Sequence, residues 1–392
     1  IIMTLNISPE TKAGYVLNWD MEKHFKGEIK AYVIQGLTDT DLTVELEHAK
    51  FMKFLKDEDL SIASNGVLYR KDKVGIIPEI LNNWFKQRKE YKDLMKRYTD
   101  EGNDELASYY NRRQHIQKIF LNSLYGVLGL PVFRFYDVDN AVAVTTTGQD
   151  VIKNTAKVVN LYYNKRLGKD DDYVTYIDTD SVYMSASPFV SELKTYEEKK
   201  NSTIEIARHM EERLNTFYDV FAERAFNCND HRFHIKGENV AKTGLWLAKK
   251  RYAMFKVYDL ETNQDVDKIA VKGLDVVRSS FPQAFKDFMN DLLKDILNKV
   301  PKSQIDSNIL KLKNSLKTKD YLDVARNTSV NNMEKYLDDY DNKALNEFKK
   351  GTPINIKSAI VHNRLIDYYN VEKEYEKIQS GTKIKYVYLR DN

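Results

Sequence analysis

The sequence predicts an α+β fold with several hydrophobic cores, and three observations support this prediction. Apolar residues recur at helical spacing across residues 78–125. Residues 173–185 read as two short strands joined by a tight turn, and residues 244–260 are strand-like in composition. A chain of 392 residues exceeds the usual size of one domain, so we expect two or three cores.

Composition excludes several classes of protein. With one cysteine, Cys228, the chain cannot hold a disulfide framework. No apolar run approaches the length of a membrane span and no signal peptide opens the chain, so we expect a soluble, intracellular protein. The formal net charge of +3 is too small to indicate nucleic-acid binding by itself. Any basic surface must therefore be local.

A pair of helices is predicted in the first third of the chain. Residues 1–76 give a mixed pattern, but from Pro78 the apolar spacing becomes helical and continues to Tyr98. The turn-forming stretch "TDEGND", residues 99–104, interrupts it, and a second helix is predicted from about Ser108 to Leu124. The two helices should form a hairpin.

Polar side chains form one stripe on each of these helices. Arg88 and Lys92 are four residues apart and share a face of the first helix. Lys118, Asn122 and Tyr125 share a face of the second.

The two stripes could meet if the hairpin turns near Gly102. Lys118 would then lie level with residue 86, and Arg88 and Lys118 would differ in height by about 3 Å. Arg88, Lys92 and Lys118 could together hold one multivalent anion such as a triphosphate. A solvated basic face is the alternative, and spacing alone favours it in a chain that is 30% charged.

The stretch "YVTYIDTDSVYMS", residues 173–185, places Asp178 and Asp180 at the tip of the predicted strand hairpin. Two like charges this close repel unless a divalent cation lies between or beside them. Mg²⁺ favours such oxygen ligands, and a two-ion site would serve phosphoryl transfer. A solvated acidic turn is the alternative, because isolated pairs of this kind are common.

The stretch "KKRYAM", residues 249–254, lies inside a longer strand-like run. Adjacent cations on a strand suggest contact with an anion, and Tyr252 could pack on a sugar or base. An exposed edge strand protected by its charges is the alternative.

These stretches, taken in order, resemble motifs of the family B DNA polymerases. The resemblance rests on "KIFLNSLYG" at residues 118–126, "YIDTDS" at 176–181 and "AKKRY" at 248–252, and it covers nearly the whole chain. The stretches "NISPETKAGY" and "FRFYDVDNAVAVTTTGQD" look most like the replicative polymerases of tailed bacteriophages, which would place the protein in a host cytoplasm.

The resemblance implies a right-hand polymerase fold, incomplete at both ends. We expect residues 1–77 to form the first part of an antiparallel palm and residues 78–125 to form a two-helix fingers hairpin. Residues 126–277 should complete the palm, and residues 278–392 should form part of a mostly helical thumb.

The resemblance also implies a role for each site residue. Lys118, Asn122 and Tyr125 match the motif that binds the incoming dNTP, and Arg88 and Lys92 match the opposing fingers helix. Asp180 matches a palm aspartate that binds Mg²⁺, with Asp178 as its neighbour and Glu238 as a further carboxylate near two ions. We therefore expect Asp178, Asp180 and Lys118 to be catalytic. The residues expected to grip primer–template DNA are Lys249, Lys250, Arg251 and Tyr252.

Part of the family pattern is missing from the sequence. A second metal-binding aspartate belongs to a motif ending "SLYPS", which in relatives of this type directly precedes residues like "IIMTLNISPE". The exonuclease region and the C-terminal contact with a sliding clamp are also missing. We expect the chain alone not to extend primers, and to need an N-terminal segment carrying the missing motif, whether it is a natural split subunit or a truncated sequence.

Two other functions remain open from the sequence. A non-catalytic module that binds primer–template DNA would need neither the metal hairpin nor the triphosphate clamp. Another right-hand polymerase, such as a reverse transcriptase, would not carry the "NSLYG" helix.

Overall fold

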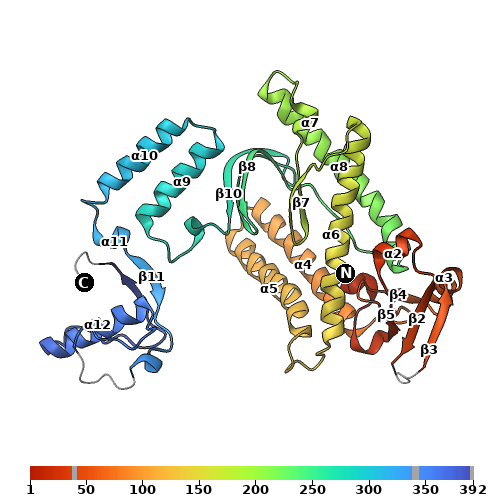
Figure 1. Ribbon diagram of the computed structural model, residues 1–392, viewed down its shortest axis with the longest axis horizontal. Coiled ribbons are helices and arrows are strands. Elements are labelled where there is room, and N and C mark those ends of the chain that lie inside the picture. The colour runs from red at the N-terminus through yellow and green to blue at the C-terminus, as the bar shows by residue number, and fades with distance from the viewer. Residues whose placement is uncertain (38–41, 338–343, 389–392) are drawn as a thin grey trace. The chain divides into compact units, whose positions relative to one another are not determined.

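The computed structural model describes residues 1–37, 42–337 and 344–388 and combines helices with antiparallel sheets (Figure 1). The predicted α+β class is confirmed, whereas the division into palm, fingers and thumb stays a prediction. Residues 38–41 of the expected palm, and residues 338–343 and 389–392 of the expected thumb, lie outside the described residues. The chain divides into two compact units, Ile1–Gly237 and Glu238–Asn392.

The first unit is organised around a five-stranded antiparallel sheet with strand order β3-β2-β1-β5-β4. Its elements are α1 (Ile2–Leu5), a 3₁₀ turn (Pro9–Thr11), β1 (Lys12–Val16), α2 (Met21–Lys26), β2 (Ala31–Gly36), β3 (Thr43–Glu47), α3 (His48–Asp57), β4 (Leu60–Ile62) and β5 (Val67–Arg70). Tyr32 and Phe51 are fully buried and stack with ring centroids 4.0 Å apart, so α3 covers one face of this sheet.

Two long helices follow, α4 (Ile76–Asp100) and α5 (Asp104–Leu128), and they lie side by side (Figure 1). The predicted helical hairpin is therefore confirmed. Gly102 turns the chain with a positive φ of 71°, a conformation in which glycine carries no steric penalty. The side chain of Asn103 accepts a hydrogen bond from the backbone N–H of Leu106 and caps the second helix.

The remainder of the first unit contains the predicted strand hairpin. Helix α6 (Val138–Leu167) precedes β6 (Val174–Asp178) and β7 (Ser181–Met184), which pair antiparallel, and α7 (Ser187–Val190) and α8 (Tyr196–Phe226) follow. Helix α8 begins with a capping box between Thr195 and Glu198.

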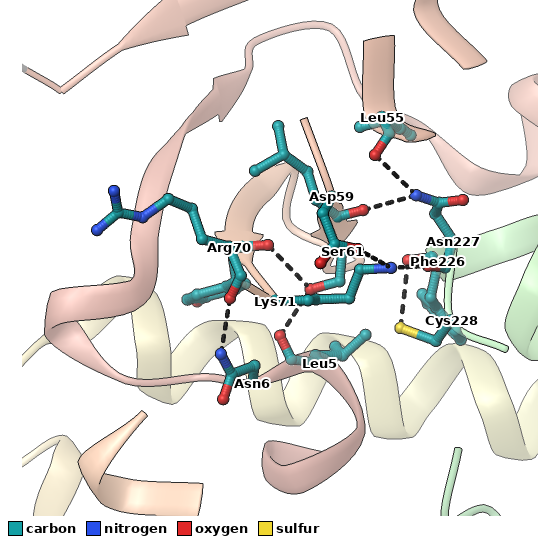
Figure 2. Close-up of polar contacts among 12 residues, drawn as sticks. Leu5, Asn6, Leu55, Asp59, Ser61, Arg70, Lys71, Phe226, Asn227 and Cys228 are labelled. Atoms are coloured by element: carbon teal, nitrogen blue, oxygen red, sulfur yellow. Dashed lines mark hydrogen bonds and ion pairs between the residues drawn. The ribbon is translucent and has the colours of Figure 1, made fainter. Parts of the chain in front are cut away.

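The C-terminal end of α8 is tied to the five-stranded sheet (Figure 2). The Asn227 amide donates to the carbonyl oxygens of Leu55 and Leu60, at 3.0 and 2.7 Å. Lys71 Nζ donates to the Asn227 carbonyl at 2.7 Å. The sulfur of buried Cys228 contacts the carbonyl of Thr4 at 3.4 Å. These contacts join segments far apart in sequence within the first unit.

The second unit begins with a three-stranded antiparallel sheet in the order β10-β9-β8. Its elements are β8 (Asn239–Ala248), β9 (Arg251–Asp259), β10 (Gln264–Lys272), a 3₁₀ turn (Asp275–Val277), α9 (Gln283–Leu297), α10 (Lys302–Ser315), α11 (Tyr321–Val324), β11 (Arg326–Ser329), a 3₁₀ turn (Met333–Tyr336), α12 (Ile354–Tyr369) and β12 (Lys383–Tyr386). Val330, Ala359 and Ile360 are buried in a small core beside the β11–β12 pair.

None of the helices in the described part of the chain combines the length and the apolar composition that crossing a bilayer requires.

Candidate functional site

Asp178 is the last residue of β6, and Asp180 is the second residue of the two-residue turn that leads into β7. Asp178 pairs with Ser181, and Thr179 takes a positive φ of 57°. The turn holds itself in shape, because the Asp178 carbonyl accepts from the Asp180 N–H at 2.7 Å and from the Ser181 hydroxyl at 3.1 Å. Asp178 is half-buried and Asp180 is exposed, so one carboxylate is anchored in the hairpin and the other faces solvent.

The base of this hairpin rests on buried tyrosines. Tyr173 is 6% exposed and lies against the fully buried Tyr163 of α6, with ring centroids 5.2 Å apart. Neither hydroxyl has a hydrogen-bond partner among the described residues. Burial raises the pKa of Tyr163 to about 12. The tyrosine rings therefore support the base of the hairpin by packing, beside a hydrogen bond of 2.9 Å that the Tyr173 N–H donates to the Asn160 side chain.

The acidic turn fits Mg²⁺ in part. Two carboxylates match an ion that takes one or two protein carboxylates and completes its shell with water and phosphate oxygens. Within residues 1–37, 42–337 and 344–388, no three His, Cys, Asp or Glu side chains gather as a metal-binding group. Glu238 is exposed at the start of the second unit, where its carbonyl accepts from the Leu260 N–H at 2.9 Å.

Contacts between α4 and α5 fix how the basic hairpin is aligned. The rings of Trp84 and Phe120 lie 5.4 Å apart, and the Gln117 amide donates to the Gln87 side chain at 2.9 Å. The members of each pair are equidistant from Gly102, so the predicted alignment is confirmed and Lys118 lies level with residue 86.

We call the residues of α4 and α5 that face the partner helix the seam. On both helices, the residue that follows a seam residue by one position points to the same side of the hairpin. Each residue advances about 100° around its helix in the same rotational sense. In two antiparallel right-handed helices, this rotation carries the position after each seam residue toward the same side. Arg88 follows Gln87 in this way, and Lys118 follows Gln117.

We call this side of the hairpin the clamp face; of the predicted residues it carries Arg88, Lys92, Lys118, Asn122 and Tyr125. Lys92, Lys118, Asn122 and Tyr125 are exposed, and the half-buried Arg88 has a buried Nε with no hydrogen-bond partner in the described structure. No described carboxylate pairs with the three cations, although Arg97 on the same helix pairs with Glu101 at 2.8 Å. Their charge is therefore available to an external anion.

The prediction of a continuous strand through residues 249–254 is wrong at its first two residues. The chain reverses at Lys249 and Lys250, so the basic run is a hairpin turn between β8 and β9, in which Ala248 pairs with Arg251. Lys250 adopts a positive φ of 59°, which a lysine rarely does. Both lysines are exposed. Local composition could not reveal the turn, because it contains no glycine, asparagine or proline.

Two neighbours of this turn were not predicted. A Cβ atom on Gly273 would lie 1.9 Å from the Lys250 carbonyl oxygen, so glycine is required there. Asp275 pairs with Arg251 at 3.2 Å and compensates its charge in part. Tyr252 is 3% exposed, so its ring supports the turn from inside rather than facing solvent.

Comparison with known proteins gives a consistent result. A sequence model described as DNA polymerase family B matches residues 1–392. The chain is 26% identical over 456 residues to the DNA-directed DNA polymerase of Enterobacteria phage T4, covering 100% of the chain and 46% of that protein. It is 26% identical over 401 residues to the corresponding protein of Escherichia phage RB69, covering 86% and 41%.

A cellular protein is also similar. The DNA polymerase alpha catalytic subunit of Xenopus laevis is 26% identical over 319 residues, which cover 81% of the chain and 19% of that subunit. The chain therefore spans less than half the length of each of these relatives.

Proposed function

The chain belongs to DNA polymerase family B, and from this premise we propose that it supplies the nucleotide-binding and primer-binding parts of a DNA-directed DNA polymerase. The reaction would be attack of a primer 3′ hydroxyl on the α-phosphate of a dNTP, with release of pyrophosphate. The observation that carries the proposal is the clamp face, which presents three cations on one side of a helical hairpin, none of them paired with a described carboxylate.

The clamp face would hold the triphosphate. Arg88 offers a planar guanidinium that can bind two oxygens, and Lys92 and Lys118 add two ammonium groups. Asn122 and Tyr125 lie toward the body of the first unit, where they would contact the rest of the nucleotide. Holding the triphosphate in line with the attacking oxygen supplies much of the rate enhancement in phosphoryl transfer.

The acidic turn would complete the reacting centre. Asp180 and Asp178 would provide carboxylate oxygens to Mg²⁺, which when bound lowers the pKa of the attacking hydroxyl and neutralises charge on the leaving pyrophosphate. The turn's own hydrogen bonds hold the backbone from which both carboxylates project. Glu238 is a further proposed ligand, and the proposed second ion would need an additional carboxylate.

The turn between β8 and β9 would hold primer–template DNA. Lys249 and Lys250 are exposed at its tip and would contact phosphates, while Arg251 would do so in competition with Asp275. Tyr252 would act by supporting the turn. In this proposal residues 1–77 and 126–277 belong to a palm, residues 78–125 to fingers and residues 278–392 to a thumb.

A partner segment is part of the proposal. The acidic turn supplies two carboxylates, so a polypeptide that carries the missing palm motif would complete the site. A non-catalytic DNA-binding module is the second candidate, favoured by the exposed cations of the β8–β9 turn. In a DNA-binding module, the acidic turn and the clamp face would have no role.

Primer extension tests the proposal. The purified chain is assayed with Mg²⁺, dNTPs and a primer–template, alone and with a segment that supplies the missing motif. In the active mixture, Lys118→Ala should raise the KM for dNTP about tenfold or more, because a charged contact contributes about 1.5–3 kcal/mol. DNA binding should be unchanged.

Lys86→Ala is the matched control, because Lys86 is an exposed cation at the same height on the other side of the hairpin. Equal effects of the two substitutions, or equal losses of dNTP use and DNA binding, would refute the clamp. Absence of extension in every mixture would favour the DNA-binding module.

A further inference from the structure

A large apolar side chain is exposed among the polar residues of the clamp face. Phe85 follows the seam residue Trp84 by one position and precedes Arg88 by three, so it shares the stripe of Arg88 and Lys92. Its side chain is 47% exposed. It is not among the aromatic rings that stack on one another in the described residues. Exposed phenylalanines are ordinary on protein surfaces, so its position is what distinguishes Phe85.

The height of Phe85 along the hairpin is defined by the seam. The next residue of its stripe toward the body of the unit is Leu81, which is 7% exposed and belongs to the main core. On the partner helix, residue 119 is level with Phe85, so the ring lies at the height between Lys118 and Asn122. Phe85 therefore forms an apolar step between the cations and the core.

The order of charged and apolar side chains along the clamp face matches the order of charged and apolar parts along a nucleotide. A triphosphate held by Arg88, Lys92 and Lys118 leaves the sugar and base to be placed elsewhere, and these present apolar edges and faces that gain free energy when they leave water. We propose that Phe85 packs against the nucleoside portion of the incoming dNTP and so adds nucleoside recognition to a phosphate clamp. This inference rests on the proposed function.

The test separates the two halves of the ligand. The full chain with a primer–template and Mg²⁺ is titrated with dTTP and, separately, with inorganic tripolyphosphate, which carries no nucleoside. Phe85→Ala should weaken dTTP binding about tenfold while changing tripolyphosphate binding less than about twofold, since roughly half of a phenylalanine side chain would lose its contact. Phe85→Leu should lose less, because it keeps an apolar contact.

Ile116→Ala is the control, since Ile116 is 45% exposed and lies on the opposite side of the hairpin. It should leave both ligands unaffected. Equal weakening of dTTP and tripolyphosphate by Phe85→Ala would mean that the ring merely supports α4 and would overturn the inference, as would unchanged dTTP binding. If the unaltered chain binds tripolyphosphate and dTTP equally well, the inference fails but the clamp stands. If it binds neither, the proposed function fails as well.

Discussion

The acidic hairpin of β6 and β7 and the basic hairpin of α4 and α5 hold their charges in opposite ways. The acidic turn is closed by its own hydrogen bonds, and the base of its hairpin packs on fully buried Tyr163. The basic hairpin spreads its cations over an exposed helical face with no described carboxylate beside them. The difference teaches that the backbone of the proposed metal-binding pair is fixed in advance, whereas the side chains of the proposed phosphate clamp would be ordered by their ligand.

The largest expected effect comes from a change in the acidic turn. Asp180→Asn removes a charge but keeps the size of the side chain, and it should reduce extension by the completed enzyme about a thousandfold, as loss of several kcal/mol of metal-assisted stabilisation requires. DNA binding should be nearly intact in a gel-shift assay. Asp170→Asn, in the exposed loop before β6, is the control. Persistent extension would remove Asp180 from the metal site.

The next effect tests how far the packing of Tyr163 supports the base of the acidic hairpin. Tyr163→Ala should lower the free energy of unfolding by about 3–5 kcal/mol, because it leaves a cavity under the hairpin. Tyr163→Phe should change it by less than about 1 kcal/mol, since the hydroxyl has no described partner. Chemical denaturation measures both. A large loss in the phenylalanine variant would show that the hydroxyl bonds to something in solution, such as a buried water.

A smaller effect concerns the core beside the five-stranded sheet. His24 of α2 is buried, and its Nδ1 lies 2.7 Å from the Tyr32 hydroxyl, which lies 3.1 Å from His48 Nδ1. Burial lowers the pKa of His24, the backbone carbonyl of Arg224 opposes this, and the nearby His48 adds to the lowering.

Because the unfolded chain then binds a proton more readily than the folded chain, stability should fall as the pH drops below the ordinary histidine range. The slope should not exceed about 1.4 kcal/mol per pH unit for this one group. Denaturant midpoints measured between pH 7.5 and 5.5, for the unaltered chain and for His24→Gln, would reveal it. An identical pH profile in the variant would assign the acid sensitivity to other groups.

The smallest effect sharpens the description of the basic hairpin. Gln117→Ala removes the side-chain bond to Gln87 and should cost about 0.5–1.5 kcal/mol, the net value of one neutral hydrogen bond. Its effect on dNTP use should be small, because the clamp residues stay on their helices. A loss as large as that of Lys118→Ala would mean that the alignment of the two helices, and not charge, limits binding.

Features that depend on neighbouring residues were predictable from the sequence, and features that depend on distant ones were not. The hairpin at Gly102 and the turn at Asp178–Asp180 follow from local periodicity and turn chemistry. The resemblance implied an antiparallel palm in residues 1–77, but the five strands of this sheet were not located from the sequence because they are short, and β4 has three residues. Helix α8 carries a readable signal, the Thr195 and Glu198 capping box, that was overlooked.

The site residues also differ in whether neighbouring or distant residues determine them. The clamp could be proposed because its members recur at helical spacing, but the role of Glu238 came from resemblance to a family. The turn at Lys250 depends on close approach to Gly273, whose separation in sequence hides the requirement. A lysine with positive φ is imposed by tertiary packing, which no local pattern records.

Because α4 and α5 are aligned symmetrically about Gly102, the tip of the basic hairpin could be replaced without changing how the two helices pair. Adding or removing whole turns in equal measure on both sides of Gly102 would lengthen or shorten the arm, yet Gln87 would still meet Gln117. A reporter domain or a new pair of chain ends could be placed between Glu101 and Asn103, both exposed, at a distance from the cations. Such a probe would label the basic hairpin and leave its cations uncovered.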